Sequence, residues 1–156
     1  MDTSEYKNFC HEEFIKHGFN KQKEMYYHSS NLGLLCALRL QKSSYGAAYY
    51  INCYYFIGSY SNPKEYPSHP EFDLYDRPIC VLSKDTYKGE HFMTALIEVE
   101  KYTVEELLPY FDQAFDEKIM PPLVNGKQEL LMHIERWGFP LPFVKSKEEV
   151  MQKLYT

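Results

Sequence analysis

Five side chains on one predicted β-hairpin form the best candidate binding site in this sequence. They combine a fixed cation, amide groups and phenols, which together can orient a carboxylate, a phosphate or a peptide backbone. Rigid strands would hold such groups in place for a ligand or a partner. The alternative is an ordinary solvated sheet face, or pairing with acids from the helices. The candidate residues are Arg39, Gln41, Tyr50, Asn52 and Tyr54.

The alternation of apolar and polar residues over 34–42 and 49–57 predicts how the two strands pair. With a connection from Ser44 to Ala47, one face of the hairpin is all core, and the other changes from apolar to polar toward the connection. A slip of one residue would mix the two faces, so the pattern favours this register. The predicted core pairs are Leu40–Ile51, Leu38–Cys53, Cys36–Tyr55 and Leu34–Ile57, and the other face pairs Leu35–Phe56, Ala37–Tyr54, Arg39–Asn52 and Gln41–Tyr50.

The familiar catalytic and metal-binding motifs do not occur in the sequence. His11-Glu12 begins like the helix of a zinc metalloprotease, but Ile15 stands where the second histidine is required. Cys10 and His11 would point about 100° apart on a helix, so they are not arranged as a nucleophile and its base. Glycine patterns for phosphates, dinucleotides or a nucleophile elbow are also missing. We therefore expect no catalytic residue, no metal site and no cofactor, and whether the chain is an enzyme stays open.

Charge and composition narrow the possible partners. Seventeen basic residues are scattered among twenty-two acidic ones, giving a net charge of -5, whereas nucleic-acid affinity needs clustered Lys and Arg. Apolar runs are too short for a membrane helix, and the first residues lack a signal-peptide pattern. We expect a cytoplasmic protein that binds neither nucleic acid nor membrane. Four cysteines without a C-x-x-C pair fit buried free thiols: Cys10, Cys36, Cys53 and Cys80.

The order of the predicted elements indicates an α+β fold. A first helix is predicted between a capping residue, Asp2, and a terminating Gly18. Strands are predicted at 24–29, 34–42, 49–57 and 93–100, with 74–82 at best an edge strand because of Pro78. We expect residues 1–156 to form a single globular domain in which an N-terminal helix and C-terminal helices pack on one face of an antiparallel sheet of about four to five strands. Three helix starts carry capping signals, Thr103 with Glu106, Asn125 with Gln128, and Ser146 with Glu149.

The proline-containing segment Ser59–Glu71 is predicted to be a surface loop, because its prolines break any ladder or helix. Its residues Tyr60, Tyr66 and His69 could form a rim for the candidate site.

Several short motifs resemble the bacterial family catalogued as domain of unknown function 4304. They are Gly18-Phe19, Met25-Tyr26-Tyr27, Leu40-Gln41-Lys42-Ser43 and Tyr50-Ile51-Asn52. The family is uncharacterised, so the resemblance implies no activity, cofactor or catalytic residue. It does imply that Gln41, Ser43 and Asn52 lie in the signature hairpin of the family, where amide side chains can fix a turn as well as a ligand.

Two functions fit these observations. The first is a non-enzymatic binding module that recognises a protein or peptide through its tyrosine-rich sheet face. Its most specific form is a toxin-neutralising immunity protein, by analogy with other small acidic single-domain bacterial proteins that lack catalytic motifs. The alternative is a small-molecule binding protein for an anionic ligand, or a hydrolytic enzyme, with a pocket between sheet and helices and Arg39 as the anion-holding group. On the first hypothesis, Arg39→Ala and Tyr54→Ala should abolish partner capture and leave thermal stability nearly unchanged. The sequence does not indicate the oligomeric state.

Overall fold

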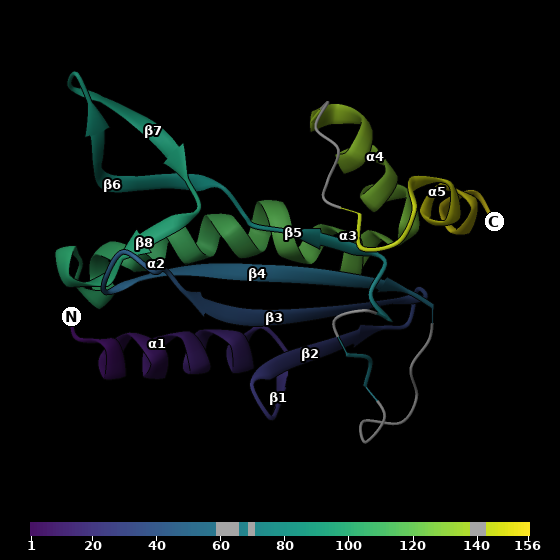
Figure 1. Ribbon diagram of the computed structural model, residues 1–156, viewed down its shortest axis with the longest axis horizontal. Coiled ribbons are helices and arrows are strands. Elements are labelled where there is room, and N and C mark those ends of the chain that lie inside the picture. Colours follow the sequence, from purple (N-terminus) through teal and green to yellow (C-terminus); the bar gives the residue numbers. More distant parts are fainter. Residues whose placement is uncertain (59–65, 69–70, 138–142) are drawn as a thin grey trace.

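An antiparallel sheet forms the centre of the structure, a computed structural model that describes residues 1–58, 66–68, 71–137 and 143–156 (Figure 1). The main sheet has six strands in the order β1-β2-β3-β4-β5, with β8 also paired to β4. Strands β6 and β7 form a separate two-stranded sheet. The strands are β1 (Asn20–Gln22), β2 (Met25–Ser30), β3 (Leu34–Lys42), β4 (Ala48–Ile57), β5 (Leu74–Asp76), β6 (Cys80–Tyr87), β7 (Glu90–Thr94) and β8 (Leu96–Glu98).

The predicted register of the central hairpin is confirmed at every pair. Leu38 lies opposite Cys53 and Arg39 opposite Asn52, and the pairing runs from Leu34–Ile57 to Lys42–Tyr49. Because side chains alternate along a strand, this register places one set of residues in the main core and the other on the opposite face of the sheet. We call that opposite face the second face.

The edge of β4 is shared by two short strands. β5 pairs with Cys53–Tyr55, and β8 pairs with Ala48–Tyr50 farther along the same edge. The predicted α+β class with an antiparallel sheet is confirmed, and the sheet is five strands wide because β5 and β8 occupy one position.

Between β5 and β8 the chain leaves the main sheet and forms the hairpin β6–β7, which projects from the body of the structure (Figure 1). The sequence predicts one edge strand at 74–82 and one strand at 93–100. In the structure each of these predicted strands is two strands, one in each sheet. The chain leaves the main sheet near Pro78, between β5 and β6, and returns to it at Ala95, between β7 and β8. Proline has no backbone N–H for a ladder, which explains the first break.

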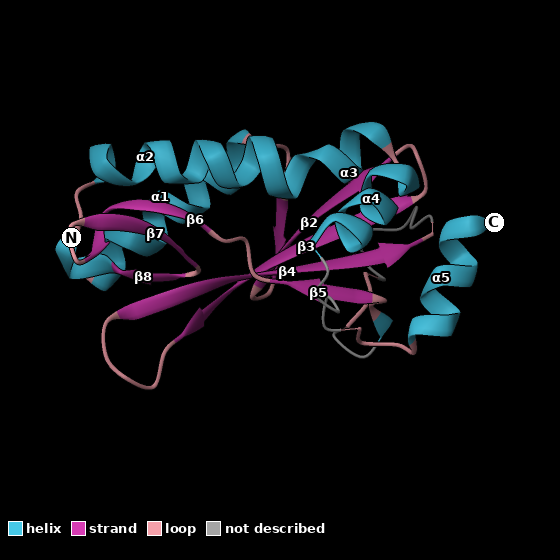
Figure 2. Ribbon diagram, turned by 90° about the horizontal axis from the view of Figure 1, so that it is seen from above, coloured by secondary structure: helices cyan, strands magenta, loops and turns pink. Residues whose placement is uncertain are grey.

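Helices pack against the face of the sheet that forms the main core. They are α1 (Thr3–Lys16), α2 (Val104–Gln113), α3 (Met120–Asn125), α4 (Lys127–Trp137) and α5 (Lys147–Tyr155), with a 3-10 turn η3 (Val99–Lys101) and a π-helical segment η4 (Ala114–Ile119). Figure 2 shows α1 and α2 on the same side of the sheet and α5 near one end of it. Phe14 and Phe111 meet Leu38 and Ile51 in this core, where all four side chains are buried.

The helix boundaries follow local signals in most places. The Asp2 side chain accepts a hydrogen bond from Glu5 N–H and begins α1. Gly18, with φ +91°, follows the helix and lets the chain turn, as Gly does in the left-handed region. Predicted caps at Thr103 and Ser146 are confirmed. The predicted cap at Asn125 is wrong, since this residue ends α3 and α4 begins only after Gly126.

A second, smaller apolar cluster lies on the second face. Its buried residues are Tyr27, Leu35, Ala37, Tyr54 and Phe72. Tyr66 stacks on Tyr27 with ring centroids 4.3 Å apart, so part of the proline-containing segment covers this end of the second face. Tyr60 and His69, the other predicted rim residues, lie outside the described residues.

Candidate functional site

A network of neutral amides and one cation occupies the polar end of the second face. The amide of Asn52 on β4 donates to Oε1 of Gln41 on β3 at 2.7 Å. Arg77, just after β5, donates through Nε to Oδ1 of Asn52 and through Nη2 to Oε1 of Gln41, both at 3.0 Å. The guanidinium carbon also lies 3.9 Å from the ring centroid of Tyr50. We call Gln41, Tyr50, Asn52 and Arg77 the arginine site.

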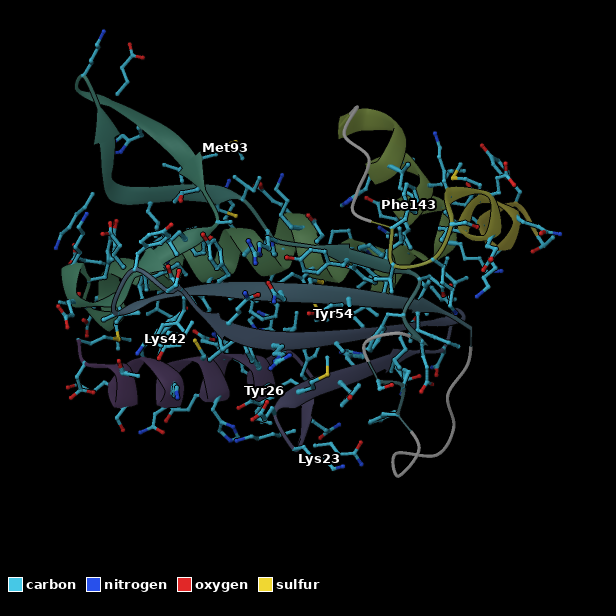
Figure 3. The ribbon with its side chains drawn as sticks, in the orientation of Figure 1. Lys23, Tyr26, Lys42, Tyr54, Met93 and Phe143 are labelled. Carbon is cyan, nitrogen blue, oxygen red and sulfur yellow. The ribbon has the colours of Figure 1, made fainter. Side chains whose placement is uncertain are left out.

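Strand pairing explains why these residues meet. Gln41 is registered with Tyr50, and Arg39 with Asn52. Arg77 lies one residue beyond the last registered pair of β4 and β5, Cys53–Asp76, which brings it beside Asn52. Arg39 on β3 and Arg77 just after β5 therefore lie on either side of Asn52 on β4. Their backbones are two strand spacings, or about 10 Å, apart across the sheet. The site occupies the stretch of the hairpin between the labelled residues Tyr54 and Lys42 (Figure 3).

The guanidinium of Arg77 has only neutral hydrogen-bond partners among the residues that the structure describes. The carboxylate of the preceding Asp76 accepts the backbone N–H of Arg77, at 2.8 Å, and no ion pair joins the two side chains. Burial raises the pKa of Tyr75, and the nearby positive charge of Arg77 opposes that increase. The half-buried guanidinium lies 3.9 Å from the ring centroid of Tyr50 and 5.9 Å from that of Tyr75, and it forms no ion pair with a described residue.

The predicted site residues fall into three groups. Gln41, Tyr50 and Asn52 meet in the arginine site. Tyr54 is only 4% exposed and packs against Phe72 in the second apolar cluster, with ring centroids 5.3 Å apart, so it contributes to packing.

Arg39 lies apart from the hydrogen bonds of the arginine site. Its side chain is 48% exposed and faces Glu24 at 3.5 Å, an exposed pair of the kind that contributes little to stability. It remains available at the surface of the second face.

Sequence reasoning missed Arg77, the cation that joins the predicted residues. Arg77 lies within the predicted edge strand at 74–82, but nothing in the sequence indicates that this strand pairs with β4 and brings Arg77 beside Asn52. The available signal was its place directly before Pro78, because a residue before proline favours extended backbone and can extend an edge strand.

The thiols offer no nucleophile. All four cysteines are free and buried. Burial raises the pKa of Cys10 and of Cys36 well above the ordinary thiol value, and it raises the pKa of Cys80 to about 11. Thiolates are the reactive form, so these groups stay protonated and inert near neutral pH.

His11 and His17 are engaged away from the arginine site. His11 hydrogen-bonds the Tyr26 hydroxyl at 2.8 Å, and His17 stacks on Phe115 with centroids 3.9 Å apart. Within the described ranges, no group of three or more His, Cys, Asp or Glu side chains could hold a metal ion. In the same part of the chain, no helix is long and apolar enough to span a membrane.

A second charged group lies at the other end of β5. The carboxylate of Asp73 is completely buried and accepts the backbone N–H of Ile57 at 2.7 Å. Lys153 of α5 lies 2.7 Å from its other oxygen, and Lys145 lies 3.3 Å from the same oxygen. Backbone bonds from Val144 and Lys145 to the Asp73 carbonyl add to this contact. The group, which we call the Asp73 cluster, attaches the C-terminal segment to the sheet.

Comparison with known proteins gives one finding about ancestry and none about activity. The family model described as Domain of unknown function (DUF4304) matches residues 10–113. The match contains α1 from Cys10 onward, every strand and all of α2, and with them the whole arginine site. The search of curated proteins and the search of solved structures returned no match.

Proposed function

Taking as a premise that the chain belongs to the DUF4304 family, which carries no assigned activity, we propose that it is a non-catalytic binding module for a protein partner. Its contact surface is the polar end of the second face: the arginine site, the exposed Arg39 and the adjoining connection between β3 and β4. The observation that carries this proposal is the fixed network of Gln41, Asn52 and Arg77, which holds a cation on rigid strands without a charged partner of its own among the described residues.

The geometry favours recognition over chemistry. General acid–base or nucleophilic catalysis needs a titratable group next to the substrate site. The arginine site contains two amides, a phenol and a guanidinium, and none of these is a good base near neutral pH. The thiols of Cys10, Cys36 and Cys80, whose pKa burial raises, are protonated there as well.

The surface beside the site is accessible for a partner. Tyr45, at the connection between β3 and β4, is 96% exposed, and Gln41 and Arg39 are exposed as well. Tyr and Arg are enriched at protein interfaces, where a large apolar body and a polar end contact a partner together. The apolar cluster around Tyr54 supplies a rigid base for this surface.

Site-specific photo-crosslinking tests the proposal. A photoreactive amino acid at position 45, in the exposed connection between β3 and β4, reports on the contact surface, and the same group at position 12 serves as the control. Glu12 is exposed on α1, on the opposite layer of the molecule. After irradiation in lysate of the source cells, we expect a discrete protein adduct from position 45 alone. Equal adducts from both positions, or none from either, would contradict the proposal.

A further inference from the structure

We propose that the arginine site binds a carboxylate group carried by an acidic segment of the partner, and that Arg77 is the group that holds it. This inference rests on the proposed function and names the chemistry of the same surface. Three features of Arg77 support it: the N–H groups that its hydrogen bonds leave over, the neutral residues around the guanidinium, and the open position of this residue on the sheet.

The guanidinium of Arg77 uses one edge and leaves another. Nε and Nη2 lie along one side of the fork, and both donate to amide oxygens of the arginine site. The bonds to Asn52 and Gln41 use Nε and Nη2 but not Nη1, and the neutral side chain of Tyr75 also hydrogen-bonds the guanidinium. The end of the fork, between Nη1 and Nη2, can therefore take the two oxygens of a carboxylate in parallel hydrogen bonds. Stacking on Tyr50 fixes the plane in which such a group would lie.

The residues around Arg77 hold it in place without neutralising it. Asn52 is 3% exposed, and both of its polar atoms are engaged, Oδ1 by Arg77 and Nδ2 by Gln41. Neutral acceptors fix the orientation of the guanidinium and leave its full charge for a ligand. A carboxylate at position 41 would accept the same two hydrogen bonds and cancel that charge.

A single carboxylate fits this charge better than a phosphate does. A phosphate monoester carries about -1.5 to -2 charges at neutral pH and is usually bound by several fixed cations. Here the second arginine, Arg39, faces Glu24 and makes no hydrogen bond to the arginine site. One arginine with one free edge matches the charge and the planar shape of an Asp or Glu side chain.

The open position of the site favours a carboxylate on a protein. Gln41 is exposed, and Arg77 and Tyr50 are partly exposed on a sheet face beside a projecting connection. Small ligands usually bind in concave, mostly apolar pockets, whereas an acidic side chain on another protein can reach such a face directly.

The variant Gln41→Glu separates binding from folding. Oε1 of Gln41 only accepts hydrogen bonds, from Asn52 and Arg77, so a carboxylate can keep both of them. It would also pair with Arg77 and occupy its charge. We expect an unchanged or higher melting temperature together with loss of carboxylate binding.

The matched control is Lys42→Gln. It changes the net charge by the same amount, at the neighbouring exposed residue, whose side chain lies on the opposite face of β3. It should leave both melting temperature and binding close to those of the wild type.

The probe is the peptide acetyl-(Gly-Glu)4-amide, with acetyl-(Gly-Gln)4-amide as its neutral counterpart and inorganic phosphate as the competing anion. NMR titration follows the backbone amide signals of Gln41, Asn52 and Arg77. We expect them to move with the acidic peptide alone, and the affinity to fall roughly tenfold or more in Gln41→Glu, the effect of losing a charge-assisted pair. Equal affinity in Gln41→Glu and wild type, or tighter binding of phosphate than of the acidic peptide, would overturn the inference.

Crosslinking from position 45 distinguishes this failure from failure of the proposed function. If the adduct persists in the Gln41→Glu background and the acidic peptide does not bind, the protein partner is real and the carboxylate assignment is wrong. If the peptide binds and the wild type gives no adduct, the anion site stands and the protein-partner proposal fails. Loss of the adduct in Gln41→Glu, with retention in Lys42→Gln, supports both.

Discussion

Replacing Asp73 by Asn keeps the shape of a completely buried side chain and removes its charge. One oxygen of the carboxylate accepts Ile57 N–H, and the other faces the ammonium groups of Lys153 and Lys145. An amide has one acceptor and one donor end. Whichever way it turns, its NH2 group would face either the backbone N–H or the lysines, so a donor would be left facing a donor.

The expected cost can be worked from these contacts. An unsatisfied buried donor costs about 1–3 kcal/mol, and breaking a buried ion pair costs about 3–5 kcal/mol. Lys145 and Lys153 are 27% and 36% exposed, so they can turn toward water, which places the result below that upper range. We expect Asp73→Asn to lower the free energy of unfolding by about 2–3 kcal/mol, which is a loss of roughly 5–10 °C in melting temperature for a chain of this size.

Urea and thermal unfolding followed by circular dichroism measure this effect. The lysines provide an internal control: Lys145→Met and Lys153→Met should each cost about 1 kcal/mol or less, because the other lysine remains. The double variant should cost more than the sum, since it leaves a buried carboxylate without a cation. A stability of Asp73→Asn within about 0.5 kcal/mol of wild type, or strictly additive lysine variants, would refute the reasoning.

Three further predictions concern the core. Burial raises the pKa of Tyr55 well above 10.0, so the stability it contributes is present below pH 10 and is lost as the pH rises through the folded pKa. Tyr55→Phe should therefore reduce the fall in unfolding free energy above pH 10. At pH 7 it should cost about 1 kcal/mol, because the hydrogen bond to the Ile119 carbonyl is lost. An unchanged dependence of the unfolding free energy on pH above 10 would contradict this. Gly18→Ala should cost at least about 1–2 kcal/mol in urea unfolding, because φ is +91° and the added carbon would lie 3.0 Å from His28; a neutral result would be inconsistent with that backbone. The four buried thiols should react with a thiol reagent only as fast as the chain opens, and rapid labelling of Cys80 in the native state would show that its burial is misassigned.

The central hairpin could be predicted in full because its pattern is local. The alternation of apolar and polar residues along 34–42 and 49–57 is compatible with one register that keeps Leu38 and Cys53 in the core. The same register explains why the second face changes from apolar at Phe56 to polar at Gln41. Tyr54 shows where the pattern stops being informative. Its position on the second face was correct, but the residues that bury it, Phe72 and Tyr75, come from a distant segment. The expectation that Tyr54→Ala would leave stability unchanged no longer holds.

Arg77 and the Asp73 cluster could not be predicted for the same reason. An edge strand at 74–82 could be predicted, but a three-residue strand carries too little periodicity to indicate its partner or its register. The contact of Asp73 with Lys153 spans eighty residues of sequence, and no local rule connects an acid before a short strand with a lysine in the last helix. Long-range charge pairing depends on the assembled sheet.

The division of the outer edge between β5 and β8 has a consequence for how the length of the chain can change. Each strand pairs with β4 independently, so the segment between them does not set the register of the main sheet. At the far end of that segment, Lys88 and Gly89 are exposed residues with φ 52° and 80° that form a tight turn between β6 and β7. Residues could be added or removed at this turn without moving Arg77 or Leu96, which makes it a natural insertion point for an epitope or a tether.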